Sequence, residues 1–347
     1  MRRRGVTLLV GTAVLIVLVV GSFVGIKVPY VELGPGPTWN TLGTDHGKQL
    51  IAITPAGKTS ESKGQLRMVT VGVEDEISLW QAIRGWLSPS DAVVPREVIY
   101  PPDQTRQQVD QQNQQDFKQS QSSAEIAALR ELGYPVQVVV TGITTGQPAD
   151  GHLKSGDFIT SVDGQQVSTT NQLTTLIKAK PAGTALTIGY TRGSAAATTS
   201  ITSAKAPDGT PRIGVSVDEK PNSPYNITFS LDDVGGPSAG LMFSLGIVDK
   251  LTPDDLTGGI DIAGTGTIDN DGKVGPIGGV PQKLVAAKSA GAKVFLTPVA
   301  NCAEAVANAK PGLLLVKVES LDAALAALDT LRSGGQPTLC DGAPRNQ

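Results

Sequence analysis

The stretch GGPSAGLMFSLGIVDKL, Gly235 to Leu251, places a serine between glycines immediately before a long apolar run. The G-P-S-A-G pattern gives Ser238 the glycine-flanked setting of a nucleophile elbow. The residues after it are almost all apolar and include no proline, which predicts a buried helix that begins near the serine. The free N–H groups at the start of such a helix could stabilise an oxyanion. We expect Gly235, Gly236 and Pro237 to form the loop that presents the nucleophile.

Activation of Ser238 is the question that this loop raises, because a serine hydroxyl is a weak nucleophile until a base removes its proton. The chain has two histidines, His46 and His152, and both precede Ser238. The α/β-hydrolase order of serine, carboxylate and histidine is therefore excluded. A phosphate-binding loop would also use a helix N-terminus, but no G-x-x-x-x-G-K-[ST] pattern occurs. A serine that uses a lysine as its base is the third interpretation.

A second stretch, IAGTGTIDNDGKVGPIGGVPQKLVAAKSAGAKVFLTP at 262–298, contains a suitable lysine. Together with the G-P-S-A-G motif, it resembles the proteolytic domain of Lon-type serine proteases. The resemblance implies that Ser238 is the nucleophile and that Lys283, in a G-G-x-x-x-K motif, is the general base. It also implies that Thr265, eighteen residues before the lysine, supports it. The whole arrangement is similar to the membrane-anchored Lon-like proteases of Gram-positive bacteria.

Lys283 can serve as a base only when its amine is neutral. A free lysine has a pKa near ~10.4 and is protonated at pH 7, whereas burial disfavours the charged form and lowers the pKa. Pro281 and Gly291 bracket a short helix in which Leu284 and several small residues surround the lysine. A pKa of about 7–8 would suit a general base. The alternative for Lys283 is a solvated surface lysine.

Residues 133–205 differ in character from the rest of the chain and resemble a PDZ domain of the bacterial protease-associated kind. Two glycine turns enclose the apolar strand FITSVD, and a helix and the strand ALTIGYTR follow. The resemblance implies a groove that binds an extended peptide by strand addition. Leu132, Gly133 and Tyr134 are the nearest candidates for a loop that holds the peptide carboxylate. The residues that carry the resemblance are Pro148, Ala149, Leu153, Gly156, Asp157, Ile159, Val162, Gly164 and Val167.

The N-terminus carries a signal for membrane topology. Val6 to Ile26 comprises 21 residues without a charge, and a helix of this length covers a hydrocarbon core of about 30 Å. Three arginines precede this run and only Lys27 directly follows it. The positive-inside rule therefore places the N-terminus in the cytoplasm and the catalytic part outside the cell membrane. A cleaved signal peptide is the alternative, although the run is longer than a usual signal h-region and no A-x-A site follows it.

Cys302 and Cys340 are the two cysteines of the chain. In an oxidising compartment outside the cytoplasm, a pair of cysteines readily forms a disulfide. Such a bond would hold the C-terminal tail, 336–347, to the body of the protein. Two unrelated thiols are the alternative.

Two helical regions precede the PDZ-like segment. EISLWQAIRGWL has a helical period, and we expect its Trp80 and Trp86 to pack in the interior. The glutamine-rich stretch DQTRQQVDQQNQQDFKQSQ predicts a polar, exposed helix or a flexible strap. A further helix is expected to begin at a capping box made by Ser122 and Glu125 and to end at Gly133.

The expected fold is α+β, a Lon-type proteolytic domain with an inserted β-rich PDZ domain, preceded by one transmembrane helix. The net charge of −3 and the lack of a basic stripe argue against nucleic acid as a partner. No cofactor or metal is expected, and without a Walker motif the activity should not need ATP. The expected segments are a cytoplasmic tip (1–5), a transmembrane helix (6–26), the first part of the protease domain with the glutamine-rich helix (27–132), the PDZ domain (133–205), the catalytic part (206–335) and a tail (336–347).

Three functions are compatible with these motifs. The first is a serine endopeptidase that cleaves unfolded or exposed segments of extracytoplasmic proteins, with the PDZ domain docking substrates or regulating cleavage. The second is a non-catalytic, peptide-binding scaffold on a retained protease fold, against which the intact Ser238, Lys283 and Thr265 argue. The third, an acyltransferase or amidase, is disfavoured by the PDZ domain. A homo-oligomer is also possible, since Lon-like domains often form rings.

Overall fold

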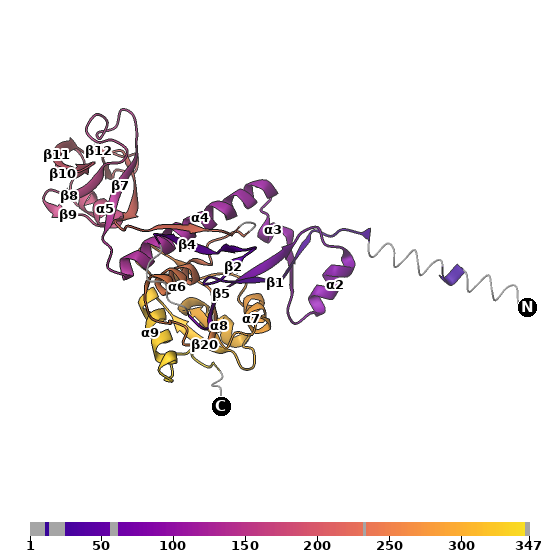
Figure 1. Cartoon of the computed structure of the whole chain (residues 1–347). Helices are drawn as coiled ribbons and strands as arrows, with labels where there is room; N and C mark the ends of the chain where they lie inside the picture. Colours follow the sequence, from indigo (N-terminus) through magenta and orange to yellow (C-terminus); the bar gives the residue numbers. More distant parts are fainter. Residues whose placement is uncertain (1–10, 14–24, 56–61, 232–233, 344–347) are drawn as a thin grey trace, which may run out of the picture.

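Apolar runs along the chain form the strands of two large sheets, each in its own unit with helices (Figure 1). The computed structural model describes residues 11–13, 25–55, 62–231 and 234–343. Most of the predicted membrane span, 6–26, lies outside these residues. In the part of the chain that the structure describes, no helix combines the length and the apolar character needed to cross a bilayer.

The larger unit is built on a six-stranded sheet in the order β20-β19-β16-β5-β1-β6. β1 (Tyr30–Asn40) pairs antiparallel with β5 (Gln65–Glu74). β6 (Ala92–Pro95) pairs with the other side of β1, also antiparallel. The register between β1 and β5 shifts between Pro35 and Thr38, where the bulge bends β1.

The other half of this sheet is parallel. β16 (Asp261–Gly264) pairs with β5, β19 (Val294–Pro298) with β16, and β20 (Leu314–Val318) with β19. Parallel neighbours need crossover connections, which α7 (Val280–Ser289) and α8 (Cys302–Ala307) provide. The sheet is therefore mixed, and both helices and strands contribute to one domain.

Helices cover both faces of the parallel strands, so successive residues enter two different cores. One core contains residues from α4 (Arg106–Glu131), α6 (Gly240–Leu251) and α9 (Leu321–Arg332), and the other contains residues from α7 and α8. The alternation explains why these strands are apolar at nearly every position. Met68, Ile262, Leu296 and Val316 face the first core, and Val69, Ala263, Phe295 and Leu315 face the second.

Helix α6 is buried along almost its whole length, which confirms the buried helix predicted after Ser238. It packs between the sheet and α4, and Phe243 contacts the rings of Phe117 and Phe229. Gly246 lies where a Cβ atom would come within 2.8 Å of the Thr41 hydroxyl, so the helix can approach β4 (Ile51–Thr54) and its neighbours closely.

The glutamine-rich stretch is an exposed helix, as one of the two predictions had it, but it is continuous with the helix that follows. α4 runs without a break from Arg106 to Glu131, and its capping box is made by Thr105 and Gln108. The predicted capping box at Ser122 and Glu125 is wrong, because both residues lie inside the helix. The polar half of α4 is exposed, whereas its second half packs on α6, which stabilises both halves as one helix.

The smaller unit is a sheet in the order β11-β10-β8-β7-β14 with helix α5 (Thr170–Lys178) packed on it. β14 (Val215–Pro221) pairs with β7 (Val136–Ile143) along its length. The predicted boundary of this unit is residue 205, whereas the sheet extends to Pro221. Its remaining strands are β8 (Phe158–Val162), β9 (Gln165–Gln166), β10 (Ala185–Arg192), β11 (Ala195–Thr202), β12 (Ala204–Lys205) and β13 (Pro211–Arg212).

Helix α2 (Leu79–Leu87) contradicts the expectation that its tryptophans are interior residues. Trp80 and Trp86 are each 56% exposed, and the helix packs on β1 and β6 through Ala82 and Gly85 instead. The remaining short elements of the larger unit are α3 (Arg96–Ile99), η1 (Val299–Asn301), and the strand pairs β2 (Thr44–Asp45) with β3 (Lys48–Gln49), β4 with β15 (Asn226–Phe229), and β17 (Thr267–Ile268) with β18 (Val274–Gly275).

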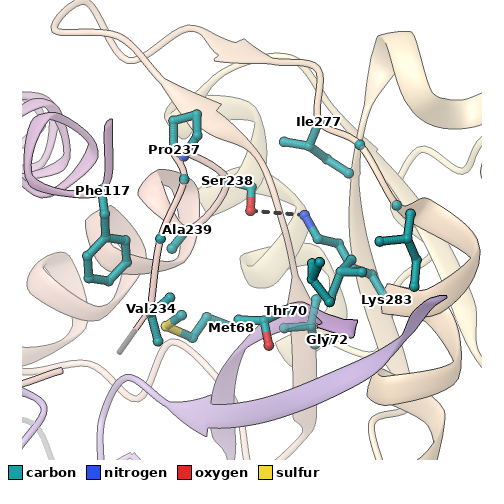
Figure 2. A pocket seen from close by; sticks show the side chains of 18 of the residues that line it. Met68, Thr70, Gly72, Phe117, Val234, Pro237, Ser238, Ala239, Ile277 and Lys283 are labelled. Carbon is teal, nitrogen blue, oxygen red and sulfur yellow. Dashed lines mark hydrogen bonds between the residues drawn. The ribbon is translucent and has the colours of Figure 1, made fainter. Parts of the chain in front are cut away.

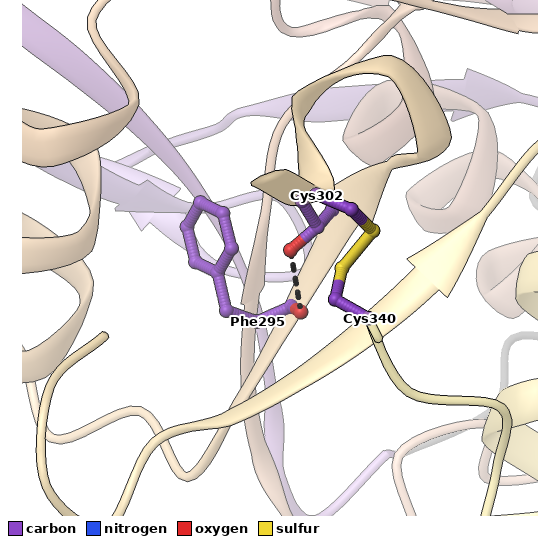
Figure 3. The surroundings of a disulfide bond; sticks show 4 residues. Phe295, Cys302 and Cys340 are labelled. Carbon is purple, nitrogen blue, oxygen red and sulfur yellow. Dashed lines mark hydrogen bonds between the residues drawn. A yellow bond between two sulfur atoms is a disulfide. The ribbon is translucent and has the colours of Figure 1, made fainter. Parts of the chain in front are cut away.

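A disulfide joins Cys302, the first residue of α8, to Cys340, in the pairing that the sequence analysis proposed (Figure 3). The tail around Cys340 runs beside β20, where Lys317 N–H donates to the Thr338 carbonyl and Cys340 N–H donates to the Leu315 carbonyl. The bond closes a loop with a sequence separation of 38 residues. It therefore fixes the tail to the edge of the sheet.

Replacing Cys302 and Cys340 together by serine should lower the free energy of unfolding by about 3–4 kcal/mol, because the unfolded chain regains the entropy of the open loop. The measurement is urea unfolding followed by circular dichroism under non-reducing conditions. The unmodified chain in reducing buffer is the control, and it should unfold at the same urea concentration as the variant. Equal midpoints for variant and oxidised parent would mean that the bond does not stabilise the fold.

Candidate active site

Ser238 lies in a loop that is shaped by glycines and held by α4. Gly236 has a φ of 84°, a left-handed conformation that glycine adopts without strain. Its N–H donates to the Asn113 carbonyl at 2.8 Å. Gly235 fits against the same residue, since a Cβ atom there would lie 2.9 Å from Asn113 Cβ. The loop delivers Ser238 directly before Ala239, the N-cap of α6.

Thr265 reaches the serine from the end of β16. Its hydroxyl donates to the Ser238 carbonyl at 3.0 Å, and the next residue, Gly266, donates its N–H to the same carbonyl at 2.9 Å. Gly266 in turn accepts from Leu241 N–H in the first turn of α6. These bonds clamp the backbone of Ser238 against the sheet, so that only its side chain is free to turn.

Lys283 comes from the first turns of α7 and is 3% exposed. The helix begins at Gly279, which has a φ of 70° and lies so close to β5 that a Cβ atom would be 2.5 Å from Val71 Cγ2. The second glycine of the G-G-x-x-x-K motif therefore lets α7 start against the sheet. Lys283 N–H donates to the Gly279 carbonyl, which fixes where the side chain leaves the helix.

The two side chains meet in the cavity (Figure 2). Lys283 Nζ lies 2.9 Å from Ser238 Oγ and 3.2 Å from Thr265 Oγ1. Burial lowers the pKa of Lys283 from 10.5 to about 8, because the ammonium form loses its hydration. A neutral amine at this distance can accept the serine proton, while the threonine hydroxyl accepts one of its N–H groups and sets its direction.

The reaction centre opens into a cavity of about 870 Å³. Its walls come from β1, β5, the nucleophile loop and the start of α7, and they are mostly apolar. Ser238 directly precedes Ala239, the N-cap of α6, so the oxyanion of a tetrahedral intermediate would form near the positive end of this helix. A serine hydroxyl, a buried amine and a helix N-terminus thus lie at one cavity that is large enough for several substrate residues.

Comparisons with known proteins agree with this geometry. Residues 233–328 match the family model described as the Lon protease (S16) C-terminal proteolytic domain, and residues 108–202 match the model of the PDZ domain. The chain carries a Lon-type proteolytic domain and a PDZ domain.

Curated proteins named Lon protease are similar to part of this chain. The chain is 39% identical over 93 residues to the Lon protease of Haemophilus influenzae, which is 26% of this chain and 11% of that protein. It is 33% identical over 143 residues to the Lon protease of Xanthomonas oryzae pv. oryzae, which is 39% of this chain and 17% of that protein. The chain therefore spans only a small part of the length of these relatives.

Solved structures are similar over the PDZ domain. The PDZ domain of the SdrC-like protein from Listeria monocytogenes is 28% identical, with a TM-score of 0.22, over 23% of this chain and 85% of that chain. The corresponding domain from Listeria innocua is 32% identical, with a TM-score of 0.23, over 23% of this chain and 92% of that chain.

The two histidines and the predicted PDZ loop do not line the cavity of the Lon-type site. Neither histidine is among the described residues that line the cavity: His46 lies in the turn between β2 and β3, and His152 lies in the PDZ domain. The N–H groups of Leu132, Gly133 and Tyr134 donate to carbonyls of α4 and close the C-terminus of that helix. They are thus not available to a peptide carboxylate, so these three residues do not form the carboxylate-binding loop that was predicted.

Sequence reasoning missed the contribution of α4 to the Lon-type site. Besides Asn113, its Phe117 lines the cavity, and Ser120 Oγ donates to the Pro237 carbonyl at 2.9 Å. These residues lie more than a hundred positions before the nucleophile in a stretch whose composition indicates only polarity. The one local signal was the isolated Phe117, an aromatic residue among glutamines.

The rate at which a fluorophosphonate probe labels Ser238 should rise about tenfold per pH unit below the pKa of Lys283 and level off above pH ~8, because only the neutral amine can accept the proton. The measurement is the labelling rate between pH 5.5 and 10. Lys283→Ala should remove both the rate and its pH dependence. Lys288→Ala, on the exposed side of the same helix, is the matched control and should keep the profile. A midpoint near the ordinary lysine pKa of 10.5 would contradict a buried base.

Ser120→Ala should slow labelling of Ser238 by about five- to tenfold, the effect of losing one positioning hydrogen bond of roughly 1 kcal/mol. The rate is compared at a single pH above the Lys283 titration, so that only loop geometry changes. Ser122→Ala, two positions further along α4, is the matched control. Labelling of Ser120→Ala at the parental rate would show that α4 does not position the nucleophile loop.

Proposed function

We propose that the protein is a membrane-anchored serine endopeptidase that cleaves peptide bonds by a Ser238–Lys283 dyad without ATP. The observation that carries the proposal is the 2.9 Å contact between a nearly fully buried lysine amine and a serine hydroxyl at a helix N-terminus. In the first step Ser238 Oγ attacks the peptide carbonyl while Lys283 takes its proton. The lysine then returns the proton to the leaving amine, and water later hydrolyses the acyl-enzyme by the same route.

An extended peptide is the substrate shape that best fits the cavity. β16 pairs with β5 only from Gln65 to Met68. Beyond Met68, residues of β5 line the cavity, and the described strands place no partner on that edge. A substrate strand could bond to this free edge and carry its scissile carbonyl past Ser238. Because the backbone must be extended, we expect unfolded segments and exposed tails as substrates.

Independence from ATP is proposed from the sequence, which contains no Walker A pattern. The extracytoplasmic location is proposed from the uncharged run 6–26 with three arginines before it. The Cys302–Cys340 disulfide supports the same side of the membrane, since such bonds persist in oxidising compartments. Substrates are therefore expected among exported proteins or the outer segments of membrane proteins.

The PDZ domain is proposed to dock substrates or to regulate cleavage through α4. Arg130, near the end of α4, donates to Glu219 of β14 at 3.0 Å, and Glu219 also accepts the N–H of Thr170 at the start of α5. The same helix holds the nucleophile loop through Asn113 and Ser120. A shift of the PDZ domain on this helix would thus be transmitted to the loop that carries Ser238.

The purified full-length chain should cleave an unfolded protein such as casein equally fast with and without ATP and magnesium. Ser238→Ala and Lys283→Ala should each reduce the rate by about 10³-fold or more, because the nucleophile and its base act as a unit. The measurement is release of fluorescent fragments, with Lys288→Ala as the control for loss of a lysine. Binding of the substrate without cleavage by the parental chain would favour the scaffold alternative.

A further inference from the structure

Helix α2 turns its apolar side away from the protein. Its nine residues, LWQAIRGWL, contain no carboxylate and one cation, Arg84. The small residues Ala82 and Gly85 are buried, whereas Trp80 and Trp86 are 56% exposed and Leu87 is 82% exposed. An amphipathic helix of a globular domain normally has the reverse arrangement. We call the outward side, made by Trp80, Trp86 and Leu87, the α2 surface.

The close packing of α2 on the sheet makes this orientation stable. A Cβ atom at Gly85 would lie 2.6 Å from Val93 Cγ2 of β6, so only a glycine lets the helix come this close. Ser78 caps the helix through a capping box with Gln81. The Trp86 ring meets the ring of Tyr30, at the start of β1, edge to face at 5.5 Å. The α2 surface is therefore a built and rigid feature of the fold.

The position of α2 in the chain identifies what covers this surface. The uncharged run 6–26 ends at Ile26, whose carbonyl accepts the N–H of Leu79, the first residue of α2. Lys27 and Ser78 form a β-bridge, and Val28 N–H donates to the Ile77 carbonyl. The last residue of the proposed membrane span is thus bonded to the helix that carries the α2 surface. Figure 1 shows α2 beside the first residues of β1, at the end of the larger unit that lies away from the PDZ domain.

We infer that the α2 surface lies in the interfacial region of the bilayer that anchors the chain. Tryptophan rings are enriched at this depth, where one part of the ring contacts acyl chains and the indole N–H contacts water or headgroups. Leu87 supplies a fully apolar contact, and the charge of Arg84 is balanced by Glu32 of β1, 3.4 Å from its guanidinium. The helix is a second membrane contact besides the span. This inference rests on the anchored topology proposed above.

Seating α2 in the interface would fix the orientation of the proteolytic domain on the membrane. The span alone fixes one point of the domain on the membrane, whereas a second contact through α2 would also limit the tilt and rotation of the domain about that point. β1 leads from this contact to the cavity, which Leu33, Pro37 and Trp39 of that strand help to line. The active site would then face polypeptide segments that lie close to the membrane surface.

The tryptophans of the chain provide a direct test. The sequence has three, Trp39, Trp80 and Trp86. Trp39 lies nine positions beyond Tyr30 on an extended strand, about 30 Å from it, and serves as an internal reporter away from the membrane. The full-length chain and its Trp80→Phe/Trp86→Phe variant are reconstituted into phosphatidylcholine vesicles with and without bromine on the acyl chains near the headgroup. Bromine quenches tryptophan on contact.

Emission of the parental chain should fall about twofold in brominated vesicles, because two of its three tryptophans contact lipid. Emission of the double variant should not change. Equal brightness of the parental chain in both vesicle types, with the protein floating with the vesicles, would overturn the inference and leave the anchor intact. A chain that does not float with the vesicles would overturn the anchor and the inference together. Parental emission that is insensitive to bromine but shifts to shorter wavelength with rising protein concentration in detergent would assign the α2 surface to a second copy of the chain.

Discussion

The structure depends on the burial of one lysine amine beside a serine hydroxyl, which is unfavourable for the charged form of the amine. The amine of Lys283 would be cationic in solvent, and removing its hydration is what lowers its pKa to about 8. The packing of β5, β16 and α7 around the amine offsets the free energy of its desolvation. Among the described residues, the amine forms hydrogen bonds with the hydroxyls of Ser238 and Thr265. The burial of Lys283 therefore affects both the activity and the stability of the protein.

The sheet positions this group by bringing together segments that are far apart in the chain. The end of β16 supplies Thr265, the first turns of α7 supply Lys283, and the loop before α6 supplies the serine. Gly235 and Gly279 allow the nucleophile loop and α7 to approach their neighbours closely, and Gly236 gives the loop its left-handed turn. The glycines of both motifs thus have a steric role that is separate from the chemistry of the serine and the lysine.

Helix α4 links the reaction centre to the rest of the protein. It backs the nucleophile loop with Asn113 and Ser120, contributes Phe117 to the cavity and contacts the PDZ domain through Arg130. At the opposite end of the larger unit, α2 is fixed to the point where the uncharged run ends. The proteolytic domain therefore lies between the PDZ domain and the α2 surface.

The sequence by itself pointed to Ser238 and Lys283, whose side chains meet in the structure, because their motifs are local and their spacing is characteristic. It also determined the buried character of α6, since an unbroken apolar run permits no exposed face. It could not determine the role of α4, which depends on contacts made across more than a hundred residues. Nor could it show that β14 belongs to the PDZ sheet, or that the apolar side of α2 faces outward. Periodicity reveals that a helix has two sides, whereas which side is covered depends on the partner that packs against it, and only the tertiary structure decides that partner.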